Sequence, residues 1–157
     1  MLRHIIHAIV VSALLTLASG CSTLVAGKAA TSDGSVMVAH SNDGDGTTVG
    51  NLQAVAAANW SLPSKTHGGV PQVAQTFAYF TKVGGYASIN EHQVALAEST
   101  CVAIFPGNRS SASLNIVDLS ALGLERASTS RGAVLEMGRL AEAYGYYDST
   151  LELFNAN

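Results

Sequence analysis

The spacing of the apolar residues changes once along this chain, and that change limits the fold more than any other feature. Up to residue 97, apolar residues come in short runs separated by Gly, Pro and Asp. Beyond residue 113 they recur every three or four residues. The first pattern is typical of β-strands and the second of amphipathic helices. Strands followed by helices predict an α+β fold, with antiparallel sheets covered by helices.

The strand pattern predicts a hairpin and a set of short strands. We expect residues 22–26 and 36–40 to form a β-hairpin, because Asp33-Gly34 between them favours a turn. Residues 52–58 carry a weaker pattern, which fits a short strand or an irregular crossing. Sharper patterns predict strands joined by tight turns at 76–80, 86–89 and 94–97.

The helical pattern predicts one helix over residues 114–126 and another from Thr129 or Ser130 to Tyr144. Apolar residues at helical spacing more often belong to a core than to a site, so we assign these helices no chemistry. The residues expected to face the core are Ile116, Leu119, Leu122 and Leu124 in the first helix, and Val134, Met137, Ala141 and Tyr144 in the second.

Composition excludes several classes of protein. The chain has 157 residues, which fits one domain, and 48% of them are hydrophobic, which argues against disorder. It carries 8 Lys+Arg against 11 Asp+Glu, a formal net charge of -3. Its basic residues are scattered singly, so no basic stripe is available for a phosphate backbone. We therefore expect no nucleic-acid partner.

The first twenty residues have the pattern of a secretory signal peptide. Arg3 precedes an apolar run over residues 8–18, and small residues follow at Ala18-Ser19-Gly20. The run is short for a bilayer, which needs about 20 apolar residues. We expect cleavage after residue 20, an exported chain of residues 21–157, and no stable membrane span after cleavage. An uncleaved anchor is the alternative.

Cleavage at that place makes Cys21 the first residue, and three interpretations of it stay open. Cys21 and Cys101 are the two cysteines of the chain, and in an exported protein such a pair often forms a disulfide. Ala18-Ser19-Gly20-Cys21 also fits a bacterial lipobox, in which the cysteine is acylated. In the third interpretation Cys21 is a nucleophile whose own α-amine is the base, because the amine titrates at about 7.7–8.0 and the thiol near 8.5.

Other arrangements of catalytic residues are not found in the sequence. There is no G-x-S-x-G, no phosphate-binding loop, no H-E-x-x-H and no C-x-x-C. His40, His67 and Glu91-His92 are scattered and have no metal-ligand spacing. We therefore expect neither a metal nor a cofactor.

Several motifs resemble, in order and spacing, the cysteine dipeptidases of the N-terminal nucleophile hydrolase superfamily, the dipeptidase A and secernin group. The first is CSTLVAGKAA at 21–30 with DGS at 33–35, and the second is HSND at 40–43. The third is INEHQ at 89–93 with ESTC at 98–101. Residues 71–79 and 124–145 are also similar to the family.

The resemblance implies a four-layer αββα fold and hydrolysis of dipeptides through an acyl-cysteine intermediate. By that resemblance Cys21 is the nucleophile, and Asp43 is an acidic residue that orients the cysteine and its amine. Thr100 stands where related acylases carry an oxyanion-hole asparagine. His40 stands near the place of their arginine, as a substrate-binding or loop-shaping residue. Asn90 and Glu91 match a turn that shapes the loop beside the nucleophile.

Length departs from the family, whose members are several times longer. We therefore expect residues 21–157 to form the N-terminal part of such a hydrolase, with an incomplete sandwich. Two classes of function stay open. One is a thiol dipeptidase acting on a dipeptide or small amide, and the other is a non-catalytic exported or lipid-anchored fragment with Cys21 acylated or disulfide-bonded. The sequence leaves open whether the chain forms a homo-oligomer.

Overall fold

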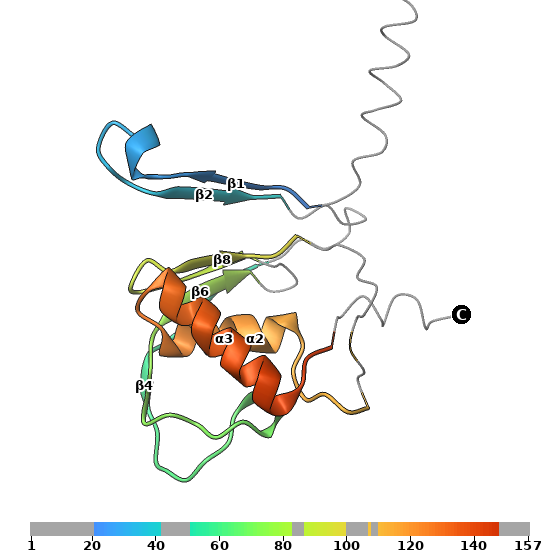
Figure 1. Cartoon of the computed structure of the whole chain (residues 1–157). Helices are drawn as coiled ribbons and strands as arrows, with labels where there is room; N and C mark the ends of the chain where they lie inside the picture. Colours follow the sequence, from blue (N-terminus) through green and yellow to red (C-terminus); the bar gives the residue numbers. More distant parts are fainter. Residues whose placement is uncertain (1–20, 42–50, 83–86, 100–106, 108–109, 148–157) are drawn as a thin grey trace, which may run out of the picture.

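A computed structural model describes residues 21–41, 51–82, 87–99, 107 and 110–147. The strands are antiparallel and lie mostly before the helices, so the expected α+β fold is confirmed. Figure 1 shows the described elements in layers. A β-hairpin lies along one face of a four-stranded sheet, and the helices α2 and α3 cover the other face.

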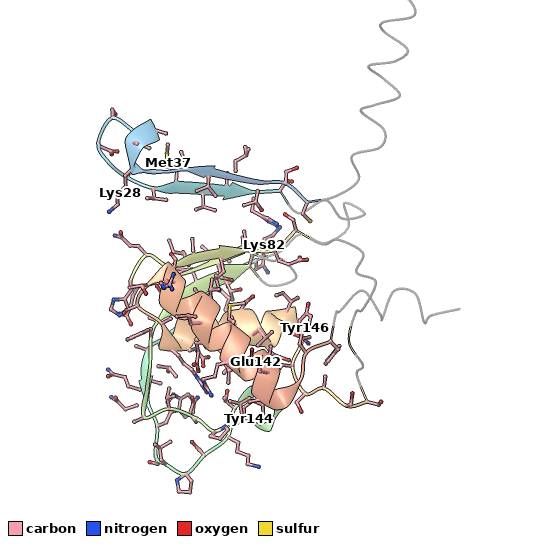
Figure 2. The ribbon with its side chains drawn as sticks, viewed as in Figure 1. Lys28, Met37, Lys82, Glu142, Tyr144 and Tyr146 are labelled. Carbon is pink, nitrogen blue, oxygen red and sulfur yellow. The ribbon has the colours of Figure 1, made fainter. Side chains whose placement is uncertain are left out.

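The predicted hairpin is present. Strand β1 (Thr23–Ala26) pairs antiparallel with β2 (Met37–His40), and the register places Thr23 opposite His40. The connection contains a 3-10 turn, η1 (Lys28–Ala30). Glycine closes the loop because residue 34 has a φ of 75°, a conformation that side chains disfavour. Met37 projects away from the four-stranded sheet (Figure 2).

The four-stranded sheet has the order β3-β6-β7-β8, and each neighbouring pair is antiparallel. Side chains alternate between its two faces, so Tyr79 and Leu96 point to the helices while Phe80 and Ile89 point to the hairpin. The strands are β3 (Leu52–Val55), β6 (Tyr79–Lys82), β7 (Ala87–Asn90) and β8 (Ala95–Ala97).

The single strand expected at 76–80 is wrong, because the chain changes sheets there. Strand β5 (Gln75–Thr76) pairs with β4 (Ala58–Asn59) in a separate two-stranded sheet, and β6 begins only at Tyr79. The amide of Phe77 donates to the carbonyl of Glu125 at 2.9 Å, so this residue bonds to a helix instead of a neighbouring strand. The short helix η2 (His67–Gly69) lies between β4 and β5.

Both predicted helices are present, with side-chain caps at their first turns. Helix α2 (Ile116–Arg126) begins after Asn115, whose side chain accepts from the amide of Asp118 at 3.0 Å. The Asp118 carboxylate accepts in return from the Asn115 amide, which completes a capping box. Helix α3 (Ser130–Tyr144) begins after Thr129, whose hydroxyl accepts from the amide of Gly132.

The core lies on the inner side of the helices, one part against the sheet and the other against Val70 and Leu114. Leu119, Leu122 and Leu124 are buried as expected. Val134 is not, because it is 65% exposed and Ala133 beside it faces the core instead. Two buried clusters carry the packing: Val70, Leu114, Leu119, Leu122 and Leu140 in one, and Val94, Leu124, Ala127 and Ala133 in the other.

Neither helix of the described residues has the length and apolar content needed to cross a membrane.

Candidate active site

Cys21 lies at the start of the hairpin, at the end where β1 begins and β2 finishes. Beyond the paired strands, the amide of Ser22 donates to the Ser41 hydroxyl at 2.9 Å. The amide of Ser41 donates back to the carbonyl of Ser22, also at 2.9 Å. These bonds continue the strand pairing to Ser22, the residue next to Cys21. Cys21 itself is half-buried. The chain segment that carries the candidate nucleophile is therefore fixed to its neighbouring strand.

This end of the hairpin also contacts the residues that follow β8. The hydroxyls of Thr23 and Ser99 share a hydrogen bond of 3.1 Å. The His40 ring donates from Nε2 to the carbonyl oxygen of Glu98 at 2.6 Å. The structure thus brings His40 and the end of β8 to the same end of the hairpin as Cys21. We call this set of contacts, made by Thr23, His40, Glu98 and Ser99, the joint.

Asp43 and Thr100, which the resemblance assigns to the site, lie outside the described residues, as does Cys101. The contacts made by Ser41, Glu98 and Ser99 were not anticipated from the sequence. A signal for the last two was present, since both belong to the ESTC motif at 98–101. The sequence does not show that Glu98 and Ser99 lie beside β1 and β2.

Asn90 lies away from Cys21, against the helices. Its side chain is buried and donates to the carbonyl oxygens of Leu124 and Ala127 at 2.9 and 2.8 Å. Its Oδ1 accepts from two amides of the following turn, each at 3.0 Å. These bonds use the full capacity of the amide group, so Asn90 ties the β7–β8 turn to the end of α2.

Glu91 supports the same turn. Its Oε1 accepts from the amide of Ala78, and its own amide donates to the Ala78 carbonyl, both at 2.9 Å. The turn precedes β8, whereas the joint lies after β8, so the two lie at opposite ends of that strand. The expectation that Asn90 and Glu91 shape the loop beside the nucleophile stays a prediction. Asn90 joins this turn to the end of α2, and Glu91 joins it to Ala78, between β5 and β6.

Charged groups in the helical layer have shifted pKa values. Burial raises the pKa of Glu125, against the opposing effects of His67 and Arg126. Burial, and then the nearby Glu125 charge, raises the pKa of Tyr79. Hydrogen bonding from Arg139 is the main cause that lowers the pKa of Glu136. These carboxylates therefore make stability depend on pH in the helical layer.

Histidines in the described part of the chain lie apart and have separate partners. His40 bonds to a backbone carbonyl, and His67 Nδ1 lies 3.3 Å from an oxygen of Asp118. The ring of His92 packs edge-on against Phe77, with the ring centres 4.3 Å apart. Among the described residues, no group of three or more His, Cys, Asp or Glu side chains is placed to hold a metal ion.

A cavity of about 140 Å³ lies between the sheet and α2. Tyr79, Thr81, Ser88 and Leu96 form its wall on the sheet, and Val117 and Ala121 lie on the helix side. These strand residues point away from the hairpin, so the cavity and Cys21 lie on different sides of the sheet.

Comparison with known proteins identifies the family of the chain. The model of peptidase family C69 matches residues 20–155. The chain belongs to peptidase family C69. No curated protein and no solved structure gives a significant match. The match covers every described residue of this C69 chain, from Cys21 at the hairpin to the end of the helical layer, so the family expected from the motifs is confirmed.

Proposed function

We propose that this C69 chain is a cysteine-type dipeptidase whose nucleophile is Cys21, exposed as the first residue when a signal peptide of residues 1–20 is removed. The observation that carries the proposal is the position of Cys21 at the joined end of the hairpin, next to the residues after β8. The family match, which begins at residue 20, supports it. The peptidase class follows from the family, and the thiol mechanism is our proposal.

The first half of the reaction uses the two groups of one residue. The Cys21 thiol attacks the carbonyl carbon of the peptide bond, and its proton passes to the Cys21 α-amine. The new S–C bond places negative charge on the carbonyl oxygen. When this intermediate collapses, the C–N bond breaks, the leaving amine takes the proton from the α-ammonium group, and an acyl-cysteine remains.

The second half uses water in the place of the amine. The α-amine takes a proton from water, and the hydroxide attacks the thioester carbonyl. The S–C bond breaks, the thiolate regains its proton, and the acid product leaves. The resemblance supports Thr100 as a hydrogen-bond donor to the charged oxygen and Asp43 as the residue that orients the amine.

The test starts from protein exported by a host cell and shown by intact mass to begin at an unmodified Cys21. We expect this form to hydrolyse dipeptides and Cys21→Ser to reduce hydrolysis to background. The unprocessed chain with residues 1–20 attached is the matched control, and we expect it to be inactive because its Cys21 nitrogen is an amide. Unchanged hydrolysis in Cys21→Ser would contradict the assignment of the nucleophile.

The same mass measurement distinguishes the dipeptidase from the non-catalytic alternative. A lipid group on Cys21, or a disulfide that involves it, would remove the thiol and end the hydrolase proposal. In that case the exported chain would be an anchored or bridged protein without thiol chemistry.

A further inference from the structure

We propose that His40 is a positioning residue, whose bond to the Glu98 carbonyl fixes Cys21 relative to the chain segment after β8. The inference rests on the proposed role of Cys21 as nucleophile. It differs from a role in binding substrate, because the Nε2 atom of His40 is already engaged with the protein backbone.

Within the part of the chain that the structure describes, apolar packing does not fix the position of the hairpin. Leu24 and Val25 lie on opposite faces of β1, and they are 72% and 66% exposed. Phe80, on the face of the sheet that points to the hairpin, is 50% exposed. A two-stranded hairpin is marginally stable by itself, so its few contacts with the rest of the molecule decide where it lies.

The joint is built on a single register pair. Thr23 and His40 are opposite each other, so their side chains leave the hairpin on the same face. They bond to consecutive residues, Ser99 and Glu98. Two bonds from one register position to neighbouring residues hold the hairpin against both sliding and rotation at that point.

The His40 bond places a chemical requirement on this position. Its acceptor is a carbonyl oxygen, so Nε2 has to carry a hydrogen. The amide nitrogen of a glutamine side chain also donates and reaches a similar distance from the backbone. A leucine fills similar space and cannot donate. These substitutions therefore separate the hydrogen bond from the volume of the side chain.

Cys21 lies close enough to the joint for a displacement there to reach its thiol. It is two residues before Thr23 along the same chain direction, a span of about 7 Å in extended backbone. A displacement of a reacting group by about 1 Å lowers a rate by about 100-fold. Loss of the His40 bond should therefore lower kcat more than it changes KM.

The experiment compares His40→Leu and His40→Gln in the processed protein, with Met37→Leu as the control at the other end of β2. We expect His40→Leu to lower kcat by about 10- to 100-fold with little change in KM, and His40→Gln to keep most of the activity. Met37→Leu should behave like the wild type. A wild-type kcat in His40→Leu, or equal losses in both His40 variants, would overturn the proposal.

Hydrogen–deuterium exchange gives a second readout that needs no activity. We expect exchange in residues 22–40 to rise in His40→Leu and to stay near the wild type in His40→Gln, with exchange in α2 and α3 unchanged. Equal exchange in wild type and His40→Leu would overturn the proposal that the His40 bond holds the hairpin in place. If the wild type shows no hydrolysis that depends on Cys21, the proposed function fails, and exchange alone then decides whether His40 positions the hairpin.

Discussion

The helical layer and the hairpin contain similar apolar residues but bury them differently. Leu122, Leu124 and Leu140 are 0% exposed in the two buried clusters of this layer. Leu24 in the hairpin is 72% exposed. An apolar pattern therefore predicts that a segment becomes a strand or a helix, and the presence of a packing partner decides how much that segment stabilises the fold.

The helical layer supplies most of the buried packing, whereas the hairpin carries the residue proposed for the chemistry. Buried apolar side chains and a buried amide hold α2 and α3 to the sheet. The hairpin, which carries Cys21, is held to the sheet through polar contacts at the joint. Regions with few buried contacts open locally at lower free energy than the core. Substitutions in the two regions should therefore have different consequences.

The largest expected difference comes from a pair of leucine truncations. Leu122→Ala should lower the free energy of unfolding by about 3–5 kcal/mol, because it leaves a cavity in the core. Leu24→Ala should change it by about 0.5 kcal/mol or less, because the side chain is exposed in the native protein. Urea unfolding followed by circular dichroism measures both. Equal losses would mean that the hairpin is as well packed as the helical layer.

Asn90 tests the polar part of the helical layer. Asn90→Ala should destabilise the protein by about 3 kcal/mol, because it leaves the buried carbonyls of Leu124 and Ala127 without their donor. Asn51→Ala is the matched control at an exposed position and should be nearly neutral. A small effect at Asn90 would show that water replaces the amide in these bonds.

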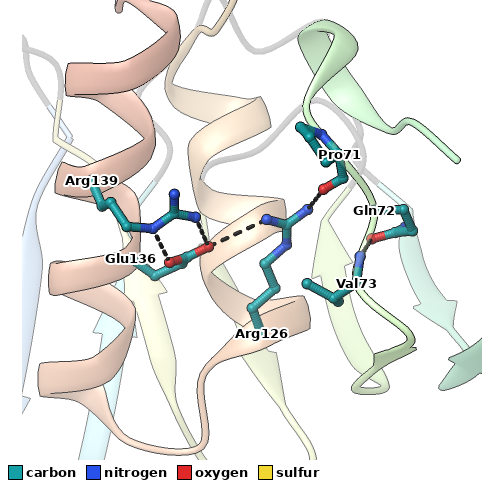
Figure 3. Close-up of polar contacts among 6 residues, drawn as sticks. All are labelled: Pro71, Gln72, Val73, Arg126, Glu136 and Arg139. Carbon is teal, nitrogen blue, oxygen red and sulfur yellow. Dashed lines mark hydrogen bonds and ion pairs between the residues drawn. The ribbon is translucent and has the colours of Figure 1, made fainter. Parts of the chain in front are cut away.

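Glu136 on α3 is joined through Arg126 to α2 and to the segment before β5, and it also accepts from Arg139 of its own helix (Figure 3). It accepts from Arg139 at 2.7 and 2.8 Å and from Arg126 at 3.3 Å, and Arg126 also donates to the Pro71 carbonyl. The Arg126 side chain is 6% exposed. Glu136→Gln should therefore cost about 1–2 kcal/mol at pH 7.

Lowering the pH should remove the difference in stability between the wild type and Glu136→Gln. The pKa of Glu136 is lowered in the folded protein, so its charge stabilises the fold above its unfolded pKa, and the contribution is lost as pH falls through the folded pKa. The two proteins should converge in stability as the pH falls below the unfolded pKa of about 4.3 and through the lower folded pKa. A constant difference between pH 7 and pH 3 would argue against the charge as the cause.

Replacing Glu125 should change stability in the opposite direction from replacing Glu136, and by the smallest amount of these substitutions. Burial raises its pKa, so the folded state disfavours its charge, and stability falls as pH rises from the unfolded pKa through the folded pKa. Glu125→Gln should therefore stabilise the protein by about 1 kcal/mol or less at pH 7 and make no difference in acid. Thermal unfolding at pH 4 and pH 7 measures this, and a destabilised variant at pH 7 would contradict it.

Sequence periodicity predicted the hairpin, α2 and α3 because each depends on residues close together in the chain. It failed at residues 77–78, where the bond from Phe77 to Glu125 joins residues far apart. It also placed Val134 in the core. At Gly123 of α2 a Cβ atom would lie 2.9 Å from the Met137 Cγ, so the helices approach closely. Ala133, a small residue, faces α2 and the sheet in this layer.

The site could be predicted from the sequence in its residues and only partly in its geometry. The motifs named Cys21 and His40, and the structure places them at the same end of the hairpin. The bonds of the joint connect residues 58 and 76 positions apart, so no local pattern could reveal them. Asn90 and Glu91 were predicted as turn residues, and the bonds from Asn90 to Leu124 and Ala127 depend on where α2 packs.

The most direct test of the account is the mass of the protein during turnover. Processed protein mixed with a dipeptide and stopped with acid should carry the acyl group of the dipeptide on the peptide that begins at Cys21, and the adduct should be lost in Cys21→Ala. Hydrolysis without such an adduct that continues in Cys21→Ala would contradict Cys21 as the nucleophile.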